Sequence, residues 1–159
     1  MKTTTNKAIA PVEGWDNIIA YLRKKTLCKT VIAVECAMGA DCDELTKEFE
    51  KLDPILFINT RELFVSPESP DISAAKSITN YFDFEKLQLA RTAIDNADDN
   101  VIVLGCGAHL VSDEDILIYV DSASAAENKI FDDHKKHFFP YVNYLIESDG
   151  AGGYKMTKQ

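Results

Sequence analysis

The sequence has 159 residues, 46% hydrophobic and 27% charged, which is typical of one globular domain rather than of a disordered chain. Acidic residues outnumber basic ones by 26 to 17, and the net charge of −9 repels a phosphate backbone, so nucleic acid is excluded as an expected partner. No apolar run reaches the roughly 18–20 residues of a membrane helix, and the polar start lacks the apolar segment of a signal peptide. We therefore expect no membrane partner.

The four cysteines stand singly in the sequence, without the C-x-x-C spacing of redox or metal motifs. Cys36 and Cys106 fall in or just after apolar runs, where buried thiols behave as small hydrophobic groups. This usage predicts a reduced chain without disulfides, and hence a cytoplasmic location.

The first half of the chain alternates between helical and strand patterns. A helix is predicted after Gly14, with an acid near its start and basic residues at 23–25 at its end. The continuous β-branched run 30–35 predicts a strand buried on both faces. After a short loop, 41–52 forms a helical pattern with acids in its first turn, and 55–58 is a second apolar strand.

The alternation continues in the second half. A short helix is predicted over 71–78 and a longer one over 82–97, followed by strands at 101–104 and 115–120. A helix is expected from Asp121 to about residue 137, and a fifth strand over 141–146 at an edge of the sheet. Strands alternating with helices predict an α/β fold, a three-layer sandwich with a mainly parallel sheet. We expect one domain over 13–148 between flexible tails at 1–12 and 149–159.

Ligands of such sheets bind beyond the carboxyl ends of the strands, and the loop at 35–42 follows the first buried strand there. A phosphate-binding loop at this place reads G-x-x-x-x-G-K-[ST], in which the Lys holds the phosphates and the hydroxyl holds magnesium. In this sequence the four positions carry Glu35, Ala40, Asp41 and Cys42. An acid in place of the Lys opposes phosphate binding. Two interpretations remain open, an altered anion site on Gly39 and the helix amides, or an inert turn.

Several short segments carry a resemblance to a known family: Gly14–Ile18, Val31–Cys36 with Gly39, Asp41 and Glu44-Leu45, Val101–Val111, and Asp115–Asp121. They resemble the N-terminal domain fused to some bacterial class I mannose-6-phosphate isomerases, over a span from Gly14 to about Phe131. That domain is similar to a degenerate uridine-kinase-type nucleoside kinase. The resemblance implies a P-loop nucleoside-kinase-like fold.

The resemblance also implies which kinase residues are missing. The acid that binds the substrate hydroxyl after the second strand corresponds to Asn59, which cannot accept a proton. The lid arginines have no counterpart, since no Arg follows Arg91 and only Lys129, Lys135 and Lys136 could replace them. Phosphoryl transfer depends on such charges, so we expect no kinase activity, no catalytic residues and no cofactor.

The isomerase activity of the family belongs to a separate zinc-binding cupin domain, and the three histidines here do not reproduce its ligands. His134 and His137 lie one helical turn apart and could form one edge of a metal site. Lys135 and Lys136 lie between them, so we favour a solvated charged face and predict no metal. Gly105-Cys-Gly-Ala-His109 is half of a dinucleotide fingerprint, either a packing turn or one that points His109 into the cleft.

The candidate ligand site therefore comprises residues from four loops. They are Glu35, Gly39, Asp41, Asn59, Arg61, Gly105, Gly107, His109 and Asp121.

The sequence favours a non-catalytic binding or regulatory module linked to sugar-phosphate metabolism. Its expected ligand is a weakly bound sugar phosphate or nucleotide, and its expected partner is an isomerase or a second copy of the chain. A residual small-molecule kinase with an atypical phosphate loop and a standalone protein-interaction module are the alternatives.

Overall fold

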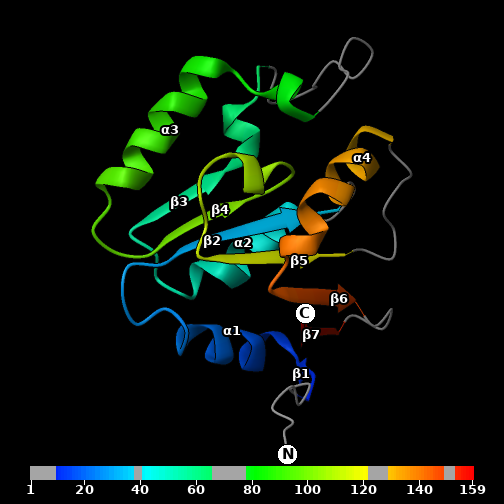
Figure 1. Ribbon diagram of the computed structural model, residues 1–159. Helices are drawn as coiled ribbons and strands as arrows, with labels where there is room; N and C mark the ends of the chain where they lie inside the picture. The colour runs from blue at the N-terminus through cyan, green and yellow to red at the C-terminus, as the bar shows by residue number, and fades with distance from the viewer. Residues whose placement is uncertain (1–9, 38–40, 66–77, 122–128, 149–152) are drawn as a thin grey trace, which may run out of the picture.

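The computed structural model describes residues 10–37, 41–65, 78–121, 129–148 and 153–159, and Figure 1 shows their arrangement. The strands are β1 (Val12–Glu13), β2 (Val31–Cys36), β3 (Leu56–Asn59), β4 (Val101–Leu104), β5 (Ile116–Val120), β6 (Tyr144–Ser148) and β7 (Tyr154–Lys158). The α-helices are α1 (Trp15–Arg23), α2 (Cys42–Glu50), α3 (Phe84–Asn96) and α4 (Lys129–Phe138). Short 3-10 turns are η1 (Thr60–Leu63), η2 (Ile78–Tyr81), η3 (Ala108–Leu110) and η4 (Phe139–Tyr141). None of the helices in these ranges is long and apolar enough to cross a membrane.

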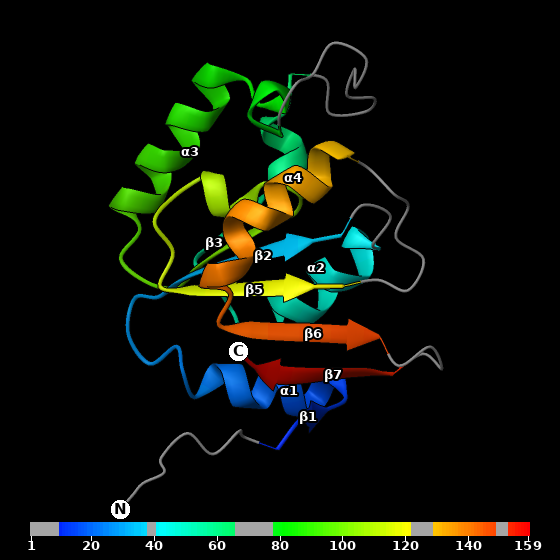
Figure 2. The same ribbon diagram turned by 45° about the vertical axis from the view of Figure 1, so that its right-hand side comes forward.

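One mainly parallel sheet organises the fold, with the strand order β1-β7-β6-β5-β2-β4-β3. Five neighbouring strands, from β6 to β3, are parallel, whereas β7 runs antiparallel to both β6 and β1. The first long strand, β2, lies in the middle; it pairs with β5 on one side, as Figure 2 shows, and with β4 on the other. The sheet therefore confirms the predicted mixed α/β class and its mainly parallel strands.

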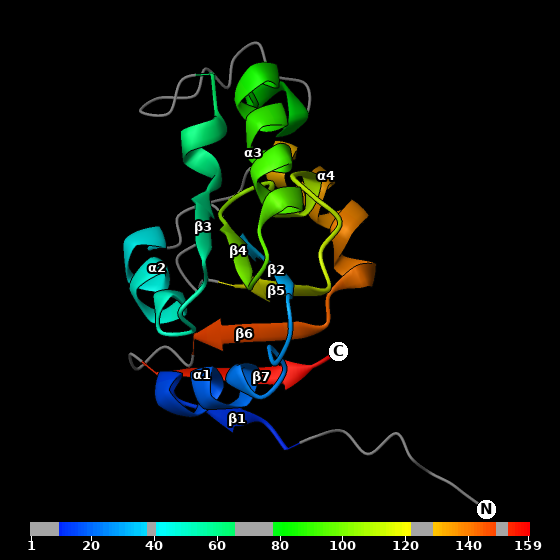
Figure 3. The same ribbon diagram turned by 90° about the vertical axis from the view of Figure 1, so that its left-hand side faces the viewer.

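Helices cover both faces of this sheet, as the edge-on view in Figure 3 shows for α2 on one side and α3 and α4 on the other. Alternate residues of a strand point to opposite faces. Accordingly, Ile32 and Val34 pack with α1 and α2, whereas Val31 and Ala33 pack with α3 and α4. All six residues of β2 are buried, which explains its unbroken apolar pattern. The protein is a three-layer sandwich.

Two expectations about the C-terminal region are wrong. The fifth strand was expected over 141–146 at a sheet edge, but β6 spans Tyr144–Ser148 and lies between β5 and β7. The expected tail at 149–159 contains β7, which pairs with β6 from Tyr144↔Lys158 to Ser148↔Tyr154. The physical reason is burial: Met156 of β7 is buried and closes the core beyond β6, while its neighbours Lys155 and Thr157 alternate outward.

Of the helices, α4 differs most from its predicted bounds. α4 begins at Lys129, not at Asp121, which directly follows β5, and residues 122–128 lie outside the described residues. The short helix expected over 71–78 also lies outside them, except for Ile78, which opens η2. α1, α2 and α3 form where periodicity and first-turn acids predicted helices.

Candidate functional site

A pocket of about 430 Å³ opens where the carboxyl ends of β2, β3 and β4 face the start of α2. This is the edge of a parallel sheet at which ligands are expected to bind. Of the nine residues predicted for the site, those that line the pocket are Asp41, Asn59, Arg61 and Gly105. Gly39 lies outside the described residues. The other four lie elsewhere.

Asp41 caps the first turn of α2. Its Oδ1 accepts a hydrogen bond from the backbone N–H of Glu44 at 3.0 Å, and its backbone is extended, as in a helix N-cap. A carboxylate at this end also complements the helix dipole. Asp41 therefore acts as the N-cap of α2, and the protein's own side chain satisfies an amide that a phosphate could otherwise bind.

Asn59 and Gly105 shape the floor of the pocket. The Oδ1 of Asn59 accepts a hydrogen bond at 3.0 Å from the backbone N–H of Arg61, so its amide serves the turn after β3. Gly105 has a φ of 132°, and a Cβ at this position would overlap the Oγ1 of the buried Thr60. Only glycine lets the chain after β4 pass this close to β3.

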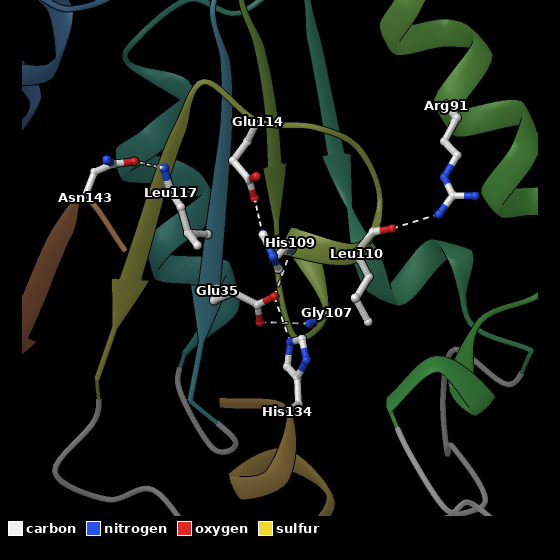
Figure 4. Close-up of polar contacts among 9 residues, drawn as sticks. All are labelled: Glu35, Arg91, Gly107, His109, Leu110, Glu114, Leu117, His134 and Asn143. Atoms are coloured by element: carbon white, nitrogen blue, oxygen red, sulfur yellow. Dashed lines mark hydrogen bonds and ion pairs between the residues drawn. The ribbon is translucent and has the colours of Figure 1, made fainter. Parts of the chain in front are cut away.

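Glu35 is fully buried and accepts three hydrogen bonds, which Figure 4 shows converging on its carboxylate. Its Oε1 accepts from the backbone N–H of Gly107 at 2.9 Å, and its Oε2 accepts from the N–H of His109 at 2.8 Å. The third donor is the Nε2 of His134 in α4, 2.9 Å from Oε2. The turn after β4 thus forms an anion-binding nest, and it holds the protein's own carboxylate.

The pairing of His134 with Glu35 corrects the expected surface role of this histidine. The ring of His134 is buried and packs against Phe131 and Phe138, whereas His137, one turn later, is exposed. A carboxylate only accepts hydrogen bonds, so the Nε2 of His134 carries the proton. This bond joins α4 to the central strand from a position 99 residues away in sequence. Among the described residues, no group of three or more acidic, histidine or cysteine side chains could hold a metal ion.

His109 and Asp121 lie away from the pocket. The Nδ1 of His109 is 2.6 Å from Oε1 of Glu114, and its ring stacks on Tyr141 at a centroid distance of 5.9 Å. Its side chain lines a second pocket on the α3 side of the sheet, together with Arg91. Asp121 follows β5 and accepts a hydrogen bond from the hydroxyl of Tyr119 at 3.2 Å. The Gly105–His109 turn therefore does not point His109 into the main pocket.

Three cysteines line the pocket, a feature that spacing along the sequence did not indicate. Cys36 ends β2, Cys106 follows β4, and Cys42 is the first residue of α2. Because β2 and β4 are neighbours with Val34 paired to Leu104, their following residues reach the same edge. The available signal was positional: each of these cysteines stands at the carboxyl end of a predicted strand or at the start of a helix.

These thiols are not equivalent. Hydrogen bonding from Cys36 is the main cause that lowers the pKa of Cys42 to about 7, and the Arg61 guanidinium adds to it; burial, Asp43 and Asp41 oppose it. The same hydrogen bond, burial and nearby negative groups raise the pKa of Cys36 well above its ordinary value. Burial also raises the pKa of Cys106. The pocket thus combines an ionisable thiol with two protonated ones.

Comparison with known proteins gives one partial match. Residues 72–127 match the model of a family described as a domain of unknown function (DUF8485). This segment includes α3, β4, β5 and the nest that holds Glu35, but not the Cys36–Arg61 side of the pocket. No curated protein and no solved structure matches the chain.

Proposed function

We propose that this chain is a binding or regulatory module built on a degenerate phosphate-binding fold of the nucleoside-kinase type, and that it does not transfer phosphoryl groups. The observation that carries the proposal is that side chains of the protein itself occupy two groups of backbone amides at the carboxyl ends of the strands. Asp41 caps α2 and Glu35 fills the nest after β4. A phosphate at either site would meet a carboxylate instead of free amides.

The topology supports the proposed origin. β2 lies between β4 and β5. After β2 the chain first adds β3 and β4 on one side of it, and then crosses over to add β5 and β6 on the other side. Doubly wound sheets bind ligands at such a reversal, beyond the carboxyl ends of the strands. The pocket at β2, β3 and β4 has this position.

The chemistry of the pocket supports a binding role rather than catalysis. No lysine is among the described residues that line it, and the Asn59 amide is engaged with its own turn. The Arg61 guanidinium is the cation there, while Asp41 and Asp43 lie at the start of α2. With no lysine among the described lining residues and with Asn59 in the place of an acid after β3, in-line phosphoryl transfer lacks main sources of rate.

The proposed ligand is a sugar phosphate or a nucleotide whose anionic group meets Arg61. A volume of about 430 Å³ lies within the roughly 300–1,000 Å³ of small-molecule sites. With one arginine and two nearby acids, we expect affinity on the order of millimolar. An isomerase of sugar phosphates is the partner we propose, on the strength of the resemblance alone.

The binding experiment is isothermal titration calorimetry with mannose 6-phosphate, UMP and ATP, each with magnesium, on the wild type and on Arg61→Gln. Loss of the binding heat in Arg61→Gln supports the proposed site. Arg23→Gln is the matched control, since it removes the same charge from the last turn of α1, and Arg23 does not line the pocket. Equal binding by both variants would place the ligand elsewhere.

Phosphoryl transfer is tested separately, by magnesium-dependent release of phosphate from ATP in the presence of uridine or mannose. We expect no turnover above a protein-free blank. Turnover that disappears in both Arg61→Gln and Asp41→Ala would show that the pocket is a working kinase site and would overturn the non-catalytic proposal.

A further inference from the structure

The pocket brings together two cysteines that are separated in sequence by a turn. Cys36 ends the buried strand β2 and Cys42 begins α2, and both side chains face the same pocket. We propose that Cys42 and Cys36 form a peroxide-sensitive dithiol, in which Cys42 reacts with a hydroperoxide and Cys36 then closes a disulfide with it. This activity does not depend on whether the pocket also binds a phosphorylated ligand.

The surroundings of Cys42 favour its role as the attacking thiol. Cys42 is partly exposed and occupies the first turn of α2, where the positive end of the helix dipole stabilises a thiolate. Interaction with the Cys36 thiol contributes most to lowering the pKa of Cys42, and Arg61 in the same pocket adds a positive charge. Asp41 and Asp43 oppose these effects without cancelling them, since the pKa of Cys42 remains lowered to about 7.

The surroundings of Cys36 suit the resolving role. Cys36 is 1% exposed and protonated, so a peroxide in solution reaches Cys42 first. The Cys36 thiol donates a hydrogen bond to the Val34 carbonyl at 3.7 Å, and its side chain lines the same pocket as that of Cys42. Cys106 also lines the pocket, but it affects the pKa of Cys36 only through space, whereas interaction between Cys36 and Cys42 is the main cause of the pKa shifts of both. This difference selects the Cys36–Cys42 pair.

The chemistry balances with hydrogen peroxide as the oxidant. The Cys42 thiolate attacks one peroxide oxygen, the O–O bond breaks, and hydroxide leaves and takes a proton to become water, which gives a sulfenic acid on Cys42. The Cys36 sulfur then attacks the Cys42 sulfur, and the sulfenic oxygen leaves as a second water with the proton of the Cys36 thiol. Two electrons pass from the two thiols to the peroxide.

The test uses the full chain, reduced and then exposed to equimolar hydrogen peroxide at pH 7, followed by alkylation, intact mass spectrometry and peptide mapping. We expect two fewer thiols to be alkylated, a protein mass lower by two hydrogen atoms before alkylation, and a cross-link between Cys36 and Cys42 in the peptide map. Dithiothreitol should reverse these changes. Loss of thiols should be roughly tenfold slower in Cys42→Ser, because about half of Cys42 is ionised at pH 7 against about 3% of a thiol with an ordinary pKa of ~8.5.

Three variants separate this mechanism from general thiol oxidation. Cys36→Ala should form the sulfenic acid on Cys42, trapped by dimedone, without a disulfide. Cys106→Ser and Cys28→Ser, which change the third pocket thiol and an exposed surface thiol, should behave as the wild type. A cross-link that maps to any other pair in the folded wild type, or oxidation of Cys42→Ser at the wild-type rate, would overturn the proposal. The wild-type map needs no variant to fold.

Discussion

Replacement of Glu35 tests whether its carboxylate is a structural anion. Glu35→Gln keeps the shape of the side chain but leaves one acceptor oxygen for three donors, the N–H groups of Gly107 and His109 and the Nε2 of His134. With this oxygen in the place of Oε2, the new NH2 group faces the N–H of Gly107, and a buried donor loses its acceptor.

The contacts set the size of the effect. A buried donor without a partner costs about 1–3 kcal/mol, and the two remaining bonds lose their charge-assisted strength, so we expect Glu35→Gln to lower the free energy of unfolding by about 2–3 kcal/mol. Glu35→Ala leaves all three donors without an acceptor and should cost about 3–5 kcal/mol, in the range found when one member of a buried pair is removed. For a domain with a typical stability of roughly 5–15 kcal/mol, either loss is large.

The assay is urea denaturation at pH 7, followed by the fluorescence of Trp15. This is the chain's single tryptophan, and it packs on Phe49 and Tyr154 on the opposite face of the sheet, so it reports unfolding of the whole domain. Glu114→Gln is the matched control, since this partly exposed carboxylate pairs with one histidine and should cost no more than ~1 kcal/mol. A Glu35→Gln protein as stable as Glu114→Gln would refute the structural role.

Substitutions at two further positions, Asp41 and Gly105, test the loops at the carboxyl ends of the strands. Asp41→Ala should lower the free energy of unfolding by about 0.5–2 kcal/mol through loss of the cap, and Asp41→Lys should lower it more because a cation faces the positive helix end. Urea denaturation measures both changes, and added phosphate should not turn either loss of stability into a gain. A neutral or stabilising result would contradict the capping role. Gly105→Ala should lower the midpoint of thermal unfolding more than Gly14→Ala. Both glycines have a positive φ, but only at Gly105 would a Cβ overlap Thr60. Equal shifts of the midpoint would contradict the close approach of Gly105 to Thr60.

Much of the fold could be predicted because burial leaves a direct mark on the sequence. The apolar run at 30–35 became β2, buried on both faces, and the run at 101–104 became β4 with the same bounds. β7 was missed because its signal is the alternation of Tyr154 and Met156 with polar residues, over five residues after a glycine-rich stretch. Such a short pattern gains its stability from pairing with β6, which the sequence does not display.

In the candidate site, too, contacts between residues close in sequence could be predicted, whereas contacts between distant residues could not. The role of Asp41 depends on residues within one helical turn, so its capping bond could be predicted locally. The role of Glu35 depends on His134 and on a turn more than 70 residues away, and the clustering of three cysteines depends on which strands are neighbours. These contacts are properties of the topology. A comparison of the loop with a phosphate-binding motif aligns Glu35 with a glycine position, but it does not indicate what the carboxylate binds.

The position of β2 at the centre of the sheet has a consequence for synthesis of the chain. Its two neighbours, β4 and β5, begin at Val101 and Ile116, so this strand has no partner during translation of the first hundred residues. Until both have left the ribosome, the nascent chain carries an apolar strand with two open edges, which favours aggregation. We expect ribosome-bound chains that expose fewer than ~120 residues to be degraded by protease and held by chaperones, with resistance appearing once β5 emerges.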